Sequence, residues 1–141
     1  MYYTRMIEIN YFAVLVGAVV AMVVGSLWYG LFYGKEWMKA IGITQKNIEK
    51  AKNKGMAGTY VLAFLGALVM SFFMAVTVDV FNAPTVVSGA LVGIFVWAGF
   101  VATTHMPHYL FDGRPVALYK IAVTYHLVEL ILVGALLAAW K

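Results

Sequence analysis

Two side chains that can hold or pass a proton stand in the apolar run YHLVELILVG, residues 125–134. His126 and Glu129 are three residues apart, and Tyr125 precedes Glu129 by four residues. On a helix these spacings place the three side chains on neighbouring positions of one face. Such a group can bind a proton or a cation, or it can join helices through polar contacts. The chemistry depends on whether the run lies in water or in lipid.

A pair of histidines stands near the end of an earlier apolar run, in ATTHMPHYLFDG. Pro107 lies between His105 and His108 and removes one backbone hydrogen bond, so a helix is expected to bend there. The hydroxyl of Thr103 or of Thr104 is suited to satisfy the disrupted backbone. The segment therefore combines a bend, two imidazoles and two hydroxyls.

The three histidines, His105, His108 and His126, are candidate metal ligands, because imidazole suits zinc, copper and iron. Their spacing matches no metal-ligand signature. If the intervening turn is at Gly113, His105 and His126 differ in depth by about 7–8 Å, which argues against haem ligation by this pair. No cofactor is therefore expected, and a metal or haem site is kept as a third hypothesis.

The composition indicates that lipid is the solvent. Of 141 residues, 64% are hydrophobic and 11% are charged, whereas about a quarter of an average soluble domain is charged. A chain of this size cannot hide so much apolar surface from water. Cysteine is absent, which excludes disulfides and thiolate metal sites.

Four apolar runs are each longer than the roughly 20 residues that a helix needs to cross a hydrocarbon core. They cover residues 10–33, 56–81, 86–111 and 116–140. None alternates with the period of a strand, which argues against a barrel. We predict an all-α integral membrane bundle of four transmembrane helices, formed by residues 1–141 as a single domain.

Lysines gather in the loop 34–55 between the first two runs. They are Lys35, Lys39, Lys46, Lys50, Lys52 and Lys54. The positive-inside rule places this loop in the cytoplasm and both termini outside, in the inner membrane. Thr44 and Gly55 are suited to begin and end a short amphipathic helix over 45–54. The loop either only sets the topology or also docks lipid headgroups or a partner; no feature indicates nucleic-acid binding.

Small residues recur at every fourth position on several predicted helices, a pattern typical of close helix packing in membranes. The predicted packing positions are Gly17, Ala21, Gly25, Ala67, Ser71, Gly89, Gly93 and Gly134. They are expected to pack helices within the bundle or between protomers. A pore lined by these residues is the alternative.

A series of motifs along almost the whole chain resembles one bacterial family. The motifs are Asn10-Tyr11, Trp28-Tyr29, Gly34-Lys35, Trp37, Gly113-Arg114-Pro115 and Tyr125-His126. The chain is similar to the small four-helix membrane proteins grouped as domain of unknown function 1761. The resemblance implies the four-helix fold and transfers no activity and no site. Residues 1–9 precede the usual start, and Glu129 stands where the pattern leads us to expect a small or apolar residue.

The leading hypothesis is a non-enzymatic membrane protein that forms homo-oligomers or serves as an accessory subunit of a larger complex. In it the small residues pack helices, while His126 and Glu129 make polar contacts between helices. No phosphate loop, acyl-transfer triad spacing or extramembrane domain indicates an enzyme.

The alternative is a small transporter or channel for a proton, a cation or a polar solute. Asp79, Glu129, His126 and His105 would then descend through the membrane as a path, with Tyr125 beside Glu129. In the simpler interpretation Asp79 is solvated at the interface, because it lies near a helix C-terminus, where the helix dipole opposes an acid.

Overall fold

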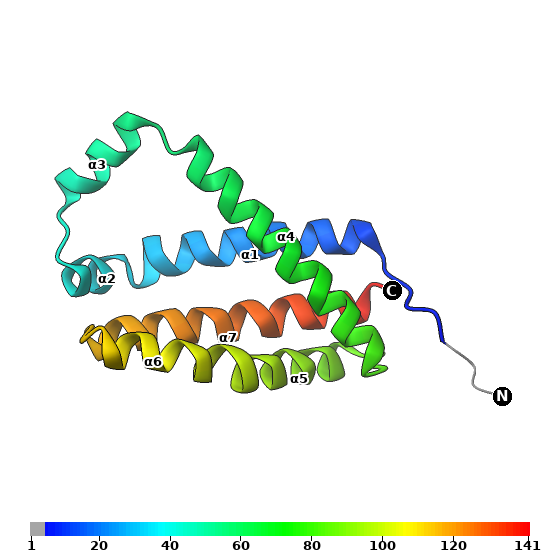
Figure 1. The fold of residues 1–141 in the computed structure, drawn as a ribbon. Helices are drawn as coiled ribbons and strands as arrows, with labels where there is room; N and C mark the ends of the chain where they lie inside the picture. Colours follow the sequence, from blue (N-terminus) through cyan, green and yellow to red (C-terminus); the bar gives the residue numbers. More distant parts are fainter. Residues whose placement is uncertain (1–4) are drawn as a thin grey trace.

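The computed structural model describes residues 5–141, and every regular element in that part of the chain is a helix (Figure 1). By length and composition, four helical spans are able to cross a membrane: Tyr11–Phe32, Ala57–Val80, Val86–Phe111 and Val116–Ala139. Each begins and ends within one residue of the predicted range. An apolar run in lipid must satisfy its own backbone groups, and a helix does so within the segment.

Two of the four spans contain a widened turn. In the first span, α1 (Tyr11–Ser26) continues into the π-helical segment η1 (Leu27–Phe32). In the third, α5 (Val86–Val96) continues into the π-helical segment η2 (Trp97–Ala102) and then into α6 (Thr103–Phe111). The second and fourth spans are the uninterrupted helices α4 (Ala57–Val80) and α7 (Val116–Ala139).

The connection between the first two spans holds two short helices, α2 (Gly34–Ile41) and α3 (Gln45–Lys54). α3 covers the residues predicted for it. The Thr44 side chain accepts a hydrogen bond from the Asn47 backbone N–H at 3.4 Å, and Gly55 follows with a φ of 91°. The sequence did not indicate α2 as a separate helix.

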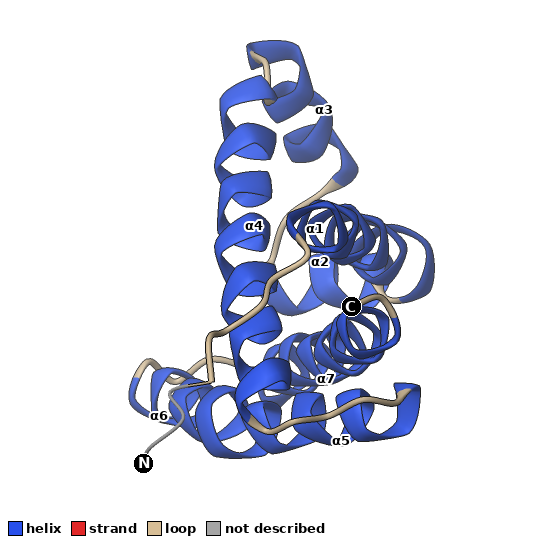
Figure 2. Ribbon diagram, turned by 90° about the vertical axis from the view of Figure 1, so that its right-hand side faces the viewer, coloured by secondary structure: helices blue, strands red, loops and turns tan. Residues whose placement is uncertain are grey.

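Three spans form a layer that α4 crosses. α1, α7 and the span from α5 to α6 run side by side, and α4 passes obliquely over one face of them (Figures 1 and 2). α7 is central, because it contacts α1, α2, α4, α5, η2 and α6. Arg5, Asp79 and Lys141 mark one end of the layer, here called the terminal end; α2 and the α6–α7 turn mark the other, here called the lysine-rich end.

The sequence predicted a bundle of four transmembrane helices, and α4 packs against the other three spans along only part of its length. Its second half packs against α1 through the small residues Ala67, Ser71 and Ala75, all of them buried. In its first half, residues 57–66, only Phe64 is even half-buried. Small residues such as Gly58 and Gly66 also lie in this half but meet no neighbour, so α4 diverges from the layer toward the lysine-rich end.

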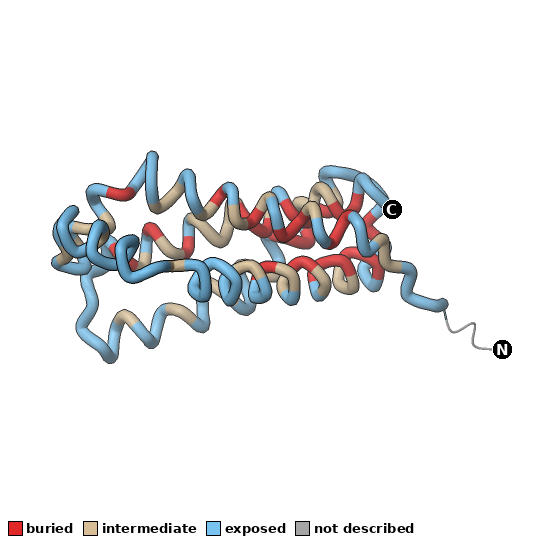
Figure 3. The backbone as a smooth tube through the Cα atoms, turned by 90° about the horizontal axis from the view of Figure 1, so that it is seen from above, coloured by how far each residue is buried: buried red, intermediate tan, exposed pale blue. Residues whose placement is uncertain are grey.

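The predicted packing positions are all buried except Gly25, which is half-buried. An added Cβ on Gly89 would collide with the Gly134 carbonyl oxygen, and one on Gly93 with the Leu130 carbonyl oxygen. An added Cβ on Gly17 would collide with the Ser71 hydroxyl oxygen, which donates a hydrogen bond to the Val14 carbonyl at 2.8 Å. These contacts hold the helix backbones close together at the terminal end, where buried residues concentrate (Figure 3).

Candidate functional site

The Glu129 carboxylate lies close to the middle of α7 and is 7% exposed. The Tyr125 hydroxyl donates to its Oε1 at 3.0 Å, and His126 Nδ1 lies 2.8 Å from its Oε2. Both partners belong to the preceding turn of the same helix, as the spacing of three and four residues favours. With Glu129 ionised, Nδ1 is the donor, since a carboxylate only accepts.

The polar group formed by Tyr125, His126 and Glu129 makes few polar contacts with another helix. The Tyr125 hydroxyl lies 3.4 Å from the Ala21 carbonyl oxygen on α1, and Gly25 on α1 leaves room for it, because an added Cβ would lie 3.2 Å from that hydroxyl. Within residues 5–141, Glu129 itself has no hydrogen-bond partner on another helix. The expectation that His126 and Glu129 join helices through polar contacts therefore finds no such bond in the part of the chain that is described.

His105 on α6 lies against His126, with ring centres 5.4 Å apart. Its Nδ1 lies 2.9 Å from the Val101 carbonyl oxygen, which can only accept, so this nitrogen carries the proton. The depth offset of about 7–8 Å that residue counting gives for the two positions does not keep their rings apart. Side chains tilt toward the N-terminus of their own helix, and on these antiparallel helices the two tilts bring the rings together.

A cavity of about 360 Å³ adjoins these side chains, where α4 diverges from the layer. Its polar wall is formed by His105, Tyr125, His126 and Glu129. The remaining wall is apolar and comes from α1, α4, η2 and α7, with Met22 and Met70 among its residues. The site therefore brings all four spans to one point.

Two tryptophans bond the backbone of α7 just before the polar group and so help to position it. Trp28 Nε1 donates to the Ile121 carbonyl at 3.1 Å, and Trp97 Nε1 donates to the Val123 carbonyl at 2.7 Å. Both carbonyls lie on α7 within the turn before Tyr125, and both tryptophans belong to widened turns. Sequence reasoning missed this role; the available signal was an indole N–H inside an apolar run, which needs a buried acceptor.

The bend expected at Pro107 takes another form. α6 continues through Pro107, and the helix is widened upstream, in η2. The Thr103 hydroxyl donates to the Gly99 carbonyl at 2.8 Å, and the Thr104 hydroxyl donates to the Phe100 carbonyl. Both threonines thus bond backbone carbonyls of η2, one turn before the carbonyl that Pro107 leaves unpaired.

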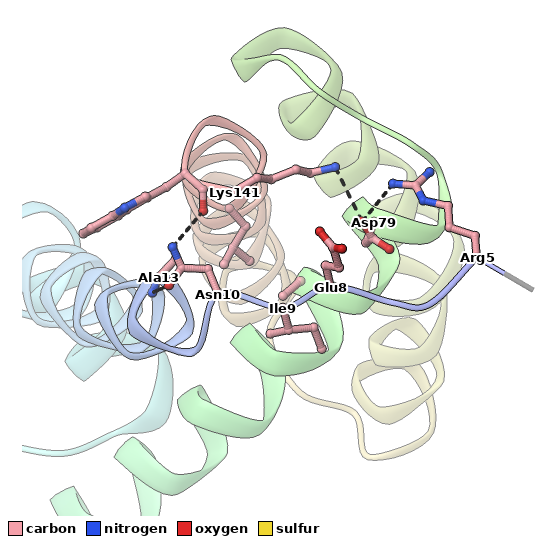
Figure 4. A pocket seen from close by; sticks show the side chains of 10 residues that line it. Arg5, Glu8, Ile9, Asn10, Ala13, Asp79 and Lys141 are labelled. Atoms are coloured by element: carbon pink, nitrogen blue, oxygen red, sulfur yellow. Dashed lines mark hydrogen bonds and ion pairs between the residues drawn. The ribbon is translucent and has the colours of Figure 1, made fainter.

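Asp79 lies at the terminal end and is 5% exposed, which corrects the interpretation that it is solvated at the interface. Arg5 contacts its Oδ1 at 3.1 Å and Lys141 contacts the same atom at 3.8 Å, so cations from distant parts of the chain compensate its burial (Figure 4). Together with Glu8 and Asn10 they line a second cavity of about 400 Å³.

The predicted path is therefore split between two cavities. Glu129, His126, His105 and Tyr125 line one, Asp79 lines the other, and the two share no lining residue. Between them lie buried residues of α1, α4 and α7, including Val14, Met74 and Val133.

The three histidines do not converge on one point. His108 lies 3.6 Å from Asp112, and 78% of its side chain is exposed, whereas His105 and His126 are neighbours. Among the described residues 5–141, no group of three or more His, Cys, Asp or Glu side chains is arranged to hold a metal ion.

The helices and the composition define a small protein that is helical over its described residues, with four helices apolar enough to span a membrane. The family model described as "Protein of unknown function (DUF1761)" matches residues 12–138, so the chain belongs to this family, as its motifs predicted. The match includes the whole Glu129 site and excludes Arg5 and Lys141. Comparisons with curated proteins and with solved structures found no match.

Proposed function

We propose that this protein is a small membrane transporter or channel that binds a proton, a cation or a small polar solute at Glu129. The observation that carries the proposal is a buried carboxylate close to the middle of the apolar span α7, held by Tyr125 and His126 at the wall of a cavity. An acid at the centre of a membrane helix costs about 2.5–3.5 kcal/mol on insertion scales, and such groups typically handle protons or ions.

The arrangement of the two cavities supports transport over static binding. Each lies toward a different end of the molecule, and a packed segment separates them. α4 contributes to both: Asp79 and Ala75 at the terminal end, and the stretch from Ala63 to Met70 at the other. A tilt of α4 against the layer would therefore open one cavity while closing the other, as alternating access requires.

The test is flux in liposomes loaded with a pH-sensitive dye, and in parallel with dyes for sodium and potassium. We expect Glu129→Gln to abolish the flux that wild type supports, without reducing the yield of folded protein. The control is Glu49→Gln, the same chemical change on the exposed helix α3, which should leave flux unchanged. Equal flux from wild type and Glu129→Gln contradicts the proposal.

A second candidate function, an oligomeric or accessory membrane subunit, is favoured by the divergent half of α4. Val61 and Leu62 are 58% and 71% exposed there, and added Cβ atoms on Gly58 and Gly66 would meet nothing within 4 Å. Small residues without a neighbour in their own chain suit close approach of another helix. The chain has no cysteine, so Leu62→Cys should cross-link two copies in membranes. A lone monomer with no cross-link and no co-purifying partner removes this candidate.

We further propose that the protein lies in the inner membrane with its lysine-rich loop 34–55 in the cytoplasm and both termini outside. Single cysteines at Asn53 and Pro84, both exposed, report on opposite ends. A membrane-impermeant maleimide added to intact spheroplasts should label Pro84→Cys and spare Asn53→Cys. The reverse pattern contradicts the orientation.

A further inference from the structure

The cavity beside Glu129 holds soft metal ligands in addition to its acid. His105 and His126 meet at its polar wall, and the thioether side chains of Met22 and Met70 contribute to its apolar wall. Imidazole and thioether are the neutral ligands that Cu(I) accepts most readily.

Each imidazole already has its Nδ1 engaged. His105 Nδ1 donates to the Val101 carbonyl, and His126 Nδ1 faces the Glu129 carboxylate. Within residues 5–141, no hydrogen bond involves Nε2 of either ring. A carbonyl or carboxylate behind Nδ1 is the usual arrangement of a metal-binding histidine, since it fixes the tautomer and leaves the Nε2 lone pair for the metal.

The spacing of the rings suits one shared ion. Two imidazoles on a single metal, at metal–nitrogen distances of about 2.0 Å and an angle of about 110–120° between them, have ring centres roughly 5–6 Å apart. The centres of His105 and His126 are 5.4 Å apart. The two rings thus lie at the spacing that a shared ion requires.

Charge balance selects a monovalent ion. Glu129 is the acid that lines this cavity, and the other lining side chains carry no carboxylate. One buried negative charge compensates one positive charge, whereas a divalent ion would leave an uncompensated charge in a low-dielectric region. The carboxylate oxygens are also engaged by Tyr125 and His126, so the hard oxygen ligands that magnesium or calcium needs are lacking.

We propose that His105 and His126 bind Cu(I) through their Nε2 atoms, with the sulfur of Met22 or Met70 completing the coordination. This inference rests on the proposed function, because it names the cation for the same cavity. Glu129 is then a positioning residue, which orients His126 and balances the charge of the ion.

The test is anaerobic titration of the full chain in detergent with Cu(I), in competition with the chromophoric chelator bicinchoninate. We expect one Cu(I) per chain. His105→Gln and His126→Gln should each weaken binding by about 100-fold or more, and Glu129→Gln by about 10–100-fold. His108→Gln, on the same helix as His105 but outside the cavity, is the matched control and should bind as wild type does.

Folding does not limit the test. Met→Leu changes conserve volume and are well tolerated, so the double variant Met22→Leu/Met70→Leu should fold and yet weaken Cu(I) binding. X-ray absorption of the wild-type complex should show nitrogen and sulfur neighbours, and the sulfur should be lost in the double variant. A spectrum without sulfur overturns the thioether assignment, and unchanged affinity in His105→Gln overturns the site.

Two further outcomes separate this inference from the proposed function. If the protein shows Glu129-dependent proton flux but binds no Cu(I), or binds Zn(II) in place of Cu(I), the copper assignment is overturned. The transporter proposal then remains intact. Cu(I) binding that depends on His105, together with proton, sodium, potassium and Cu(I) flux that Glu129→Gln leaves unchanged, supports the metal site and contradicts the transporter proposal.

Discussion

The helices pack in different ways at the two ends of the layer. Toward the terminal end, glycines bring backbones into direct contact, as at Gly89 and Gly134, and the buried residues concentrate there (Figure 3). Toward the lysine-rich end, aromatic side chains stand between the helices, and the first half of α4 leaves the layer. Tight packing without adjustable side chains resists change, and the cavity at the terminal end lies beside it, next to the chain ends at Arg5 and Lys141. The cavity of the open end lies among the four spans, beside Glu129.

The candidate site lies where these two regions meet. On α7, Glu129 is followed directly by the buried Leu130, whose carbonyl contacts Gly93. Tyr125, one turn earlier, packs edge-to-face against Tyr29 of η1 with ring centres 5.5 Å apart. The difference teaches that the backbone at Glu129 adjoins the rigid region, while its carboxylate, which Tyr125 and His126 hold, lines the cavity of the open one.

The largest expected loss of stability comes from a substitution in the rigid region. Gly93→Ala should lower the free energy of unfolding in detergent by about 3 kcal/mol, because its Cβ would collide with the Leu130 backbone oxygen. Gly99→Ala is the control on the same span, since an added Cβ there meets nothing within 4 Å, and it should be neutral. Equal losses in the two variants would mean that the regions do not differ in packing.

A double-mutant cycle sharpens the comparison at the α1–α4 contact. Gly17→Ala should cost about 2 kcal/mol through its collision with the Ser71 hydroxyl, and Ser71→Ala about 1 kcal/mol through its lost hydrogen bond. In the double variant the collision is absent, so the combined cost should fall short of the sum by about 1–2 kcal/mol. Additive costs, measured by the same unfolding assay, would show that this contact is loose.

A smaller effect is expected at the boundary. Glu129→Ala should destabilise by about 2 kcal/mol, because it leaves the Tyr125 hydroxyl without its acceptor. Glu129→Gln should cost less than about 1 kcal/mol, since the amide oxygen still accepts from Tyr125 and the amide nitrogen can donate to His126. If Glu129→Gln is as unstable as Glu129→Ala, the acid has a structural role and its link to the cavity weakens.

The smallest effect belongs to the ion pairs at the rim of the terminal end. Asp79→Asn should lower stability by less than about 1 kcal/mol, because 58% of the Arg5 side chain remains exposed. The loss should shrink further at about 1 M salt, where such pairs are screened. Asp112→Asn at the opposite end is the control, and a salt-independent loss above that of the control would show that Asp79 stabilises by other means.

The parts of the fold that depend on local rules could be predicted from the sequence. Span limits follow from hydropathy, and α3 follows from its cap residues Thr44 and Gly55. The divergence of α4 could not be predicted, because it depends on where its small residues find partners on other helices. The widened turns η1 and η2 likewise leave no periodic signature in the sequence.

The same division applies to the candidate site. Contacts of Glu129 with Tyr125 and His126 span one helical turn, so spacing alone predicts them. The approach of His105 to His126 depends on the tilt of side chains on antiparallel helices, which residue counting ignores. Arg5 reaches Asp79 across 74 positions of sequence, a distance at which no local pattern is informative.

The central place of α7 has a consequence for biosynthesis. The ribosome makes α7 after every other helix that it contacts, and membrane helices are inserted before they associate. Until then α1 and α4 can already pair, whereas Gly89 and Gly93 of α5 face acyl chains in place of their eventual neighbours. The nascent protein therefore completes its interior only when this helix enters the bilayer.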